Sequence, residues 1–495
     1  MLSRLFVIKE SCDKYLIHGI IHMVIQVKRD LFKNTLIIAI GKFSTQIISY
    51  LLLPLYTSIL STEEYGTYDL LVTICIFAIP LITIMMEESM FRFLIDEETS
   101  IGKMKVMSTA CIYAILSTIF WCGLSFIILS LFHYKYALVF ILYMISSILM
   151  KLANGISRGM SKIKIYSLSN FILSILTIIL NILFIAKYNW GVNGLLYSTI
   201  LANIITCLFV LFKLKVYSLI KIKYFDKKKL KTMLKYSFPL VPNNISWYII
   251  NISDRVVVVS FLGSAVNGVY AMANKFPNIM NNMASFFFTA FKENAAVAIK
   301  KDNYEKYYSN IYSIAHNMFI TISVLIISIL PFVFSLFIKK DYVEAYNYIP
   351  LLVIALYYGN MSGFYGTLFT AFKDSKTIGK STIVGAIINL VVHLSLITFI
   401  GIYAAIISTL LSNYAVTLYR KIKLKKYVSL EPIENYWLSI LMLVFVTVIY
   451  HVNNLYLNIA SLLVVIVYTL LVNKNLLLDI KKVILGKINT RKARN

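Results

Sequence analysis

Fourteen long apolar runs constrain this 495-residue chain more than any other feature. A helix needs roughly 20 mainly apolar residues to cross a bilayer, and the runs lack the every-second-residue alternation of transmembrane strands. Only 14% of the residues are charged, against about a quarter in a soluble domain. The sequence therefore predicts an all-α integral membrane protein with about 14 transmembrane helices. The expected spans are residues 34–56, 67–94, 106–132, 136–156, 166–186, 192–212, 237–261, 266–291, 309–337, 345–372, 378–399, 402–420, 436–452 and 455–473.

The excess of basic residues follows the topology of these spans. Lys and Arg number 48 against 22 Asp and Glu, which gives a net charge of +26. Cytoplasmic loops of membrane proteins are rich in Lys and Arg. With both termini on that side, 39 basic residues fall inside and four fall outside, namely Lys135, Lys187, Lys339 and Lys340. The charge therefore indicates orientation and contact with membrane lipids, not nucleic acid binding.

Several signals that would suggest other chemistry fail. The five cysteines include no CxxC pair, which argues against a zinc site or a disulfide framework, and no cofactor is expected. Three histidines, His316, His393 and His451, occur singly and are expected to be packed or hydrogen-bonded. Residues before the first span lack a small-residue cleavage site, so they are expected to be cytoplasmic or interfacial, with Met1 or Met23 as the start.

The two halves of the chain contain similar motifs. Glu64-Tyr-Gly66-Thr-Tyr68 follows the first span and Val266-Asn-Gly268-Val-Tyr270 follows the seventh, an offset of 202 residues. Four further identities at an offset of 210 pair Gly191, Ser198, Thr199 and Asn203 with Gly401, Ser408, Thr409 and Asn413. Because an even number of spans separates the copies, both enter the membrane from the same side. This predicts two pseudo-symmetric six-helix lobes in a parallel repeat, plus two appended helices.

These patterns divide the chain into six predicted segments. They are an N-terminal cytoplasmic or interfacial segment (1–33), an N-lobe (34–213), a basic cytoplasmic linker (214–236), a C-lobe (237–422), the appended pair (436–473) and a basic cytoplasmic tail (474–495).

Charged side chains inside the spans mark the candidate site, since each costs roughly 2.5 to 3.5 kcal/mol at bilayer depth and usually faces water or another charge. Residues three or four apart share a helix face, so the polar residues form stripes. The stripes comprise Lys42 and Gln46; Glu88 and Arg92; Asn244, Asn251 and Arg255; and Lys275, Asn278 and Asn282. We expect them to line one central water-filled cavity between the lobes. Its basic groups suit a phosphate or pyrophosphate, whereas Glu87, Glu88 or Asp254 could bind a coupling ion.

Alternatives for these residues stay open. Glu88 with Arg92, and Asp254 with Arg255, could be neutral pairs that only hold helices together, although Lys42 and Lys275 then have no matching acid. A second ambiguity concerns two prolines, Pro80 and Pro277, one in the second helix of each lobe. Each removes a backbone hydrogen bond, which predicts either a gating hinge or a static kink.

Two sets of motifs have the pattern of a known family. The first runs from Gly41-Lys42-Phe-Ser-Thr-Gln46 through Leu53-Pro54-Leu-Tyr56 and the Glu64–Tyr68 motif to Met90-Phe-Arg92-Phe. The second half adds Phe238-Pro239-Leu-Val-Pro242, Ile252-Ser-Asp254-Arg255 and Gly268-Val-Tyr270. Together these stretches resemble the Wzx-type polysaccharide flippases. The site residues carried over from the resemblance are Arg92 and the Asp254-Arg255 pair.

The resemblance implies the multidrug/oligosaccharidyl-lipid/polysaccharide exporter superfamily, whose two lobes alternate between inward and outward openings. The implied cargo is an undecaprenyl-pyrophosphate-linked oligosaccharide. It would move from the inner to the outer leaflet of the bacterial cytoplasmic membrane for surface polysaccharide synthesis, alongside glycan polymerase or assembly proteins and with H⁺ or Na⁺ as coupling ion. The lipid II flippase is similar, and its last two spans form a groove for the lipid tail. A protein of this kind is a transporter and not an enzyme.

Two other functions compete with this one. A multidrug/cation antiporter of the same superfamily would favour a net acidic cavity, and the basic groups above argue against that. A membrane glycan polymerase or glycosyltransferase would be expected to carry catalytic groups on a sizeable outward loop, whereas the outer loops expected in this sequence are short.

Overall fold

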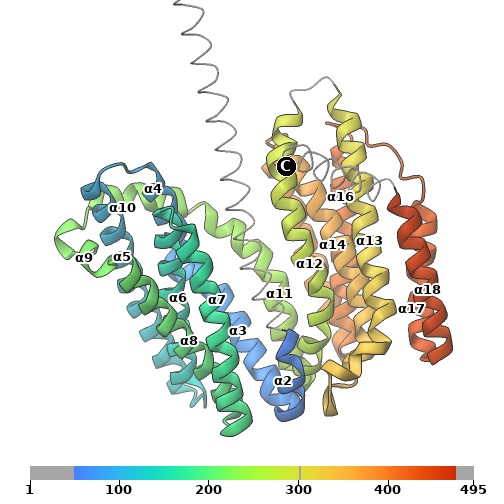
Figure 1. The fold of residues 1–495 in the computed structure, drawn as a ribbon, viewed down its shortest axis with the longest axis horizontal. Helices are drawn as coiled ribbons and strands as arrows, with labels where there is room; N and C mark the ends of the chain where they lie inside the picture. Colours follow the sequence, from blue (N-terminus) through green and yellow to red (C-terminus); the bar gives the residue numbers. More distant parts are fainter. Residues whose placement is uncertain (1–49, 300–302, 475–495) are drawn as a thin grey trace, which may run out of the picture. The chain divides into compact units, whose positions relative to one another are not determined.

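The computed structural model describes residues 50–299 and 303–474 (Figure 1). In this part of the chain the regular secondary structure is helical and no strand occurs. Helices satisfy their own peptide groups, which is the requirement for crossing lipid, and the predicted all-α class is confirmed. The elements are α2 (Leu53–Ile59), α3 (Thr62–Thr83), α4 (Met86–Asp96), α5 (Ser100–Leu131), α6 (Ala137–Gly159), α7 (Ile163–Asn181), η1 (Ile182–Lys187), α8 (Gly191–Lys213), α9 (Val216–Leu219), η2 (Ile222–Tyr224), α10 (Lys227–Ser237), α11 (Leu240–Leu262), α12 (Ser264–Ala298), α13 (Tyr304–Phe337), η3 (Lys340–Tyr342), α14 (Ala345–Ala371), α15 (Ser375–Ile400), α16 (Tyr403–Leu424), α17 (Tyr436–Val452) and α18 (Leu455–Val472).

Each expected span from the second onward coincides with helices in the described part of the chain. Eight of the helices described there are both long and apolar enough to cross a bilayer: α3, α5, α6, α7 with η1, α8, α13, α15 and α18. Four others, α11, α12, α14 and α16, have 23, 35, 27 and 22 residues and are also long enough to cross a bilayer. The first expected span, residues 34–56, lies mostly outside the described residues.

The second expected span, residues 67–94, is two helices instead of one. Pro80 lies in α3, and the helix ends three residues later. Ile84 and Met85 then have φ angles of 49° and 51°, in the left-handed region that non-glycine residues rarely adopt. The interruption therefore follows Pro80 and does not coincide with it. Pro277, by contrast, lies within the continuous helix α12.

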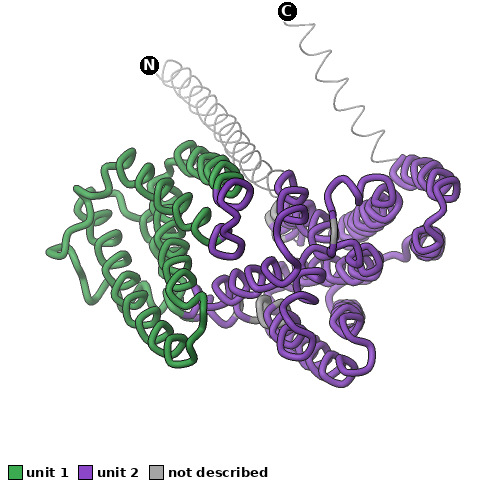
Figure 2. Tube along the Cα trace, turned by 90° about the horizontal axis from the view of Figure 1, so that it is seen from below, with its two compact units in different colours: residues 1–49, 82–183, 196–238 green, residues 50–81, 184–195, 239–495 purple. Residues whose placement is uncertain are grey.

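The helices form two compact units, which Figure 2 shows in different colours. The described part of unit 1 comprises residues 82–183 and 196–238, and that of unit 2 comprises residues 50–81, 184–195, 239–299 and 303–474. In unit 1, α6 packs against α4, α5 and α7. The units group residues 50–81 with the C-terminal half, so the two six-helix lobes stay a prediction.

Unit 2 is a series of packed helices in which α12 contacts α14, α14 contacts α16, and α16 contacts α15. The appended helices α17 and α18 pack against α13 and against each other. Tyr450 of α17 also stacks on Tyr346 of α14, with ring centroids 4.1 Å apart. The outer side chains of the pair are apolar and exposed, such as Trp437 at 76% and Leu471 at 68%. Exposed apolar side chains of this kind suit contact with lipid.

The two repeated motifs meet inside unit 2. A Cβ added at Gly66 would lie 1.8 Å from the carbonyl oxygen of Ser264, and one added at Gly268 would lie 1.9 Å from that of Thr62. The buried amide of Asn267 donates to the carbonyl of Gly66 at 2.7 Å. Only glycine permits such a close approach of two backbones. The repeated motif therefore builds a contact between the first turns of α3 and α12.

Candidate functional site

The predicted site residues fall into three groups. Lys42 and Gln46 lie outside the described residues, as does the side chain of Asn251. The residues in unit 1 are Glu87, Glu88 and Arg92. The residues in unit 2 are Pro80, Asn244, Asp254, Arg255, Lys275, Pro277, Asn278 and Asn282. A cavity common to all of them stays a prediction.

In unit 1, two charged residues of α4 pair differently from the suggested arrangement. Glu88 accepts a hydrogen bond from Arg158 of α6 at 3.1 Å, and Arg92 pairs with Asp96 one turn further along α4. The suggested pair of Glu88 with Arg92 is therefore wrong. Spacing on one helix placed both on the same face, but it could not show that a neighbouring helix supplies the arginine for Glu88.

Arg255 of α11 has its partner on another helix. Its Nε donates to Oδ2 of Asp69 in α3 at 2.7 Å, and the two side chains are only 14% and 16% exposed. The ion pair of Arg255 is thus with Asp69 and not with Asp254, the residue before it. Consecutive residues point about 100° apart around a helix, so the two side chains face different neighbours.

Asp254 belongs to a buried polar cluster contributed by four helices. Its Oδ2 accepts hydrogen bonds from Thr409 Oγ1 of α16 at 2.9 Å and from the Tyr270 hydroxyl of α12 at 3.3 Å. Its Oδ1 lies 3.3 Å from Nδ1 of His393 in α15, and the two side chains are 4% and 0% exposed. We call Asp254, Tyr270, His393 and Thr409 the Asp254 cluster.

Asn389 fixes the surroundings of this cluster. It lies one turn before His393 on α15, and its amide donates to Ser408 and Thr409, each at 3.3 Å. Its carbonyl oxygen accepts from Ser253 at 3.4 Å. Buried networks of this kind hold side chains in one arrangement. Ser408 and Thr409 are also members of the repeat at offset 210, which therefore has a structural role in unit 2.

Lys275 and Asn278 of α12 provide hydrogen-bond donors without a carboxylate partner. The Lys275 ammonium lies 5.9 Å from the centre of the Tyr65 ring, and no acid of the described residues is within ion-pair distance of it. Asn278 accepts from Asn281 at 3.0 Å, and Asn281 accepts from Asn360 of α14 at 2.8 Å. A cation beside a row of amides can bind phosphate or sugar oxygens.

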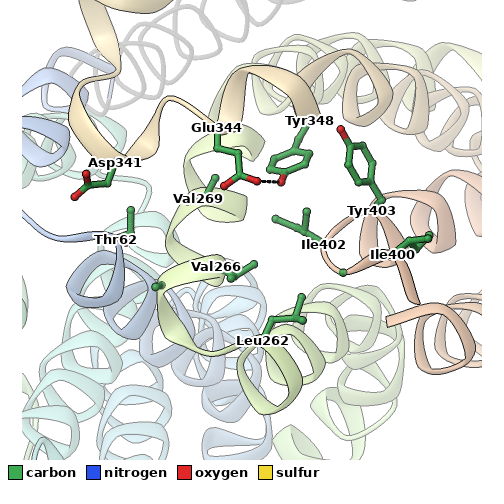
Figure 3. Close-up of a pocket in the computed structure, with 12 residues that line it drawn as sticks. Thr62, Leu262, Val266, Val269, Asp341, Glu344, Tyr348, Ile400, Ile402 and Tyr403 are labelled. Carbon is green, nitrogen blue, oxygen red and sulfur yellow. Dashed lines mark hydrogen bonds between the residues drawn. The ribbon is translucent and has the colours of Figure 1, made fainter. Parts of the chain in front are cut away.

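A separate cavity of about 480 Å³ lies in unit 2, where several helices meet their connecting loops (Figure 3). This volume is within the range of small-molecule sites. Figure 3 shows the Tyr348 hydroxyl turned toward the carboxylate of Glu344, to which it donates a hydrogen bond, with Tyr403 beside it and Asp341 on the opposite wall. No predicted site residue lines this cavity. Its two carboxylates make it acidic, unlike the predicted anion site.

Sequence reasoning missed three residues of these sites: Asp69, Arg158 and His393. Asp69 lies just inside the second expected span and Arg158 just beyond the fourth, so both have the positions of ordinary interfacial charges. His393 is buried, as expected for a lone histidine. Its contact with Asp254, which is far away in the sequence, arises from helix packing. No local sequence pattern could have predicted this contact.

Comparison with known sequences gives one family match. A family described as "Polysaccharide biosynthesis protein" matches residues 31–292, which is more than half of the chain. Among curated proteins, none matches this sequence.

Comparison with solved structures finds the same fold in membrane transporters. The lipid II flippase MurJ, in an inward closed conformation, aligns with a TM-score of 0.72 at 16% identity and covers 90% of this chain and 99% of its own. An inward-facing MATE family multidrug transporter of the MOP superfamily aligns with a TM-score of 0.67 at 18% identity, over 79% of this chain and 100% of its own. A MOP superfamily transporter from Pyrococcus furiosus, described as having a binding pocket of reverse polarity, gives 0.54 at 16% identity, over 79% of this chain and 96% of its own.

Proposed function

The chain belongs to the polysaccharide biosynthesis protein family, and we propose that it is a flippase for lipid-linked oligosaccharides that works by alternating access. Its cargo is an undecaprenyl-pyrophosphate-linked repeat unit, moved from the inner to the outer leaflet of the bacterial cytoplasmic membrane. Both termini lie in the cytoplasm. The proposal is supported by the family match and by a fold similar to that of a lipid II flippase.

One observation carries the transport part of this proposal. Four ionisable side chains, Asp69, Asp254, Arg255 and His393, are at most 16% exposed in helices of a mainly apolar chain. Ionisable groups at membrane depth are expensive, and they usually serve an ion or substrate pathway. The Asp69–Arg255 pair alone would serve a structural role, because its two charges cancel. Asp254 is a further buried carboxylate that this pair does not neutralise.

Lys275 and Arg92 are the cations that we propose for the pyrophosphate. Lys275 lacks an acidic partner among the described residues, and Arg92 is 47% exposed beside Asp96. Arg255 already pairs with Asp69, so we expect it to contribute less than Lys275 and Arg92 to direct contact with the pyrophosphate. The remaining residues of the proposed cavity are Lys42, Gln46, Asn244, Asn251, Arg255 and Asn278, with Pro80 and Pro277 as proposed gating positions.

Asp254 is the strongest of the three proposed ion-coupling acids. Glu88 is neutralised by Arg158. Glu87 is only 8% exposed and accepts a hydrogen bond from Thr83 at the end of α3. Asp254 instead faces three other helices and has one carboxylate oxygen without a hydrogen bond among the described residues.

Antiport of drugs or cations is the second candidate, because a MATE family multidrug transporter has a similar fold. A cationic cargo would be repelled by Lys275. The antiporter therefore predicts that Lys275 is dispensable or inhibitory, whereas the flippase requires it.

The test is deletion of the gene in its host, followed by measurement of lipid-linked repeat units on the inner leaflet. We expect them to accumulate, and wild-type protein to restore export. Lys275→Ala should fail to restore it and Lys275→Arg should restore it in part. Lys306→Ala, which removes an exposed lysine at the start of α13, is the matched control and should rescue fully. Normal glycan export in the deletion strain would refute the proposal.

A further inference from the structure

We propose that Asp254 and His393 together bind one exchangeable proton, and that this proton, not Na⁺, is the ion coupled to transport. The coupling of this proton to transport rests on the flippase function proposed above. Proton binding by the pair does not, because it follows from the contacts within unit 2 alone.

The pair has polar atoms that its surroundings leave unsatisfied. Oδ1 of Asp254 and both ring nitrogens of His393 are buried and lack a hydrogen-bond partner among the described residues. Nevertheless, Oδ1 and Nδ1 are only 3.3 Å apart, so a small rotation of the ring lets one proton bridge them. Buried polar atoms without partners are destabilising. A ligand that satisfies them must be small, since the two side chains are 4% and 0% exposed.

The charge balance calls for one positive charge. Arg255 pairs with Asp69, so the charges of Asp69, Asp254 and Arg255 together leave one negative charge unmatched. Around Asp254, α12 contributes the phenol of Tyr270, α15 contributes the imidazole of His393, and α16 contributes a hydroxyl. One bound proton makes the group neutral. An ionised carboxylate that is buried without a counter-charge is strongly unfavourable.

The donor atoms favour a proton over an alkali cation. Hard cations select a shell of oxygen ligands, but the open oxygen of Asp254 faces a ring nitrogen. The hydroxyls of Tyr270 and Thr409 direct their hydrogens toward the other carboxylate oxygen. Imidazole, in contrast, exchanges a proton near physiological pH.

Proton release has a mechanical consequence. It restores a negative charge between α11, α15 and α16, where the carboxylate is desolvated. The free-energy cost of that charge biases the packing of these three helices. Uptake of the proton removes the cost, so the proton-bound and proton-free forms favour different arrangements of unit 2.

The first experiment measures proton uptake by the full-length protein in detergent without any cargo. Between about pH 5 and 8, wild type should take up one proton more than Asp254→Asn and one more than His393→Gln. Asp96→Asn, which removes an exposed acid outside the cluster, should match wild type. Equal uptake by wild type and both cluster variants overturns the inference. Retention of the step in His393→Gln alone assigns the proton to Asp254 and overturns the shared site.

The second experiment measures binding of radioactive sodium to wild-type protein, with choline as the competing cation. It needs no variant, so it decides even where a substitution prevents folding. We expect no saturable sodium binding, and saturable binding would overturn the inference. Neither result depends on the accumulation assay for lipid-linked glycans. If the flippase function is wrong, that assay will fail while proton uptake by the cluster is unaffected.

Discussion

Removal of the Asp69 carboxylate tests whether the buried Asp69–Arg255 pair stabilises the fold. Breaking a fully buried pair costs about 3 to 5 kcal/mol, because the remaining charge is left without a partner. Here the side chains are 14% and 16% exposed, and Asp254, next to Arg255 in the chain, gives the guanidinium some compensation. We therefore expect Asp69→Asn to lower the free energy of unfolding by about 2 to 3 kcal/mol.

The assay is unfolding of the purified protein in mixed micelles with increasing sodium dodecyl sulfate. Two further variants sharpen it. Asp96→Asn breaks the exposed pair with Arg92, whose side chains are 47% and 58% exposed, and should cost about 0.5 kcal/mol or less. The double variant Asp69→Asn/Arg255→Gln removes both charges and should recover most of the loss. If the double variant were no more stable than Asp69→Asn alone, the buried unpaired charge would not be the cause.

Three other substitutions have clear expectations. Gly268→Ala places a Cβ 1.9 Å from a backbone oxygen and should sharply reduce the yield of folded protein in detergent chromatography, whereas Gly123→Ala, with open space around it, should not. Arg420→Lys keeps the charge of a residue that is 1% exposed but loses part of a fork of bonds to α14 and α15; we expect a loss of about 1 to 3 kcal/mol by the same unfolding assay. Asp226 accepts the amides of Lys229 and Lys228 at the start of α10, and these bonds lower its pKa. A carboxyl whose pKa is lowered by folding stabilises the folded state at pH values above its ordinary pKa. The wild-type protein should therefore be more stable than Asp226→Ala by about 1 kcal/mol at neutral pH. This difference should disappear below about pH 4, as measured by hydrogen exchange of α10.

The positions of the helices could be predicted because they depend on local properties. An apolar run of about 20 residues has few alternatives to a helix in lipid. The expected spans 106–132 and 309–337 accordingly end within one residue of α5 and α13, although both helices begin earlier than expected. The break at Ile84 and Met85 could not be predicted in the same way. Neither residue favours a left-handed conformation, and the sequence there is as apolar as the rest of the span.

The candidate site shows where local reasoning ends. Asp254 and Arg255 stand out in the sequence as charges that require partners, since each lies within an apolar run. Their partners, His393 and Asp69, come from α15 and α3. Helical periodicity gives the face of one helix, but it contains no information about which face of another helix packs against it.

Polar contacts between helices also join α11, α12, α14 and α16. These helices carry the groups that pair across unit 2, such as Asp254 with Thr409 and Asn281 with Asn360. A single helix of this kind would expose polar groups to lipid at a cost, so each depends on its neighbours for its place in the membrane. Such mutual dependence makes their packing sensitive to any charge that appears among them. A proton that joins or leaves the Asp254 cluster changes the charge at this point, and for that reason the cluster is suited to drive a change of conformation instead of only stabilising one.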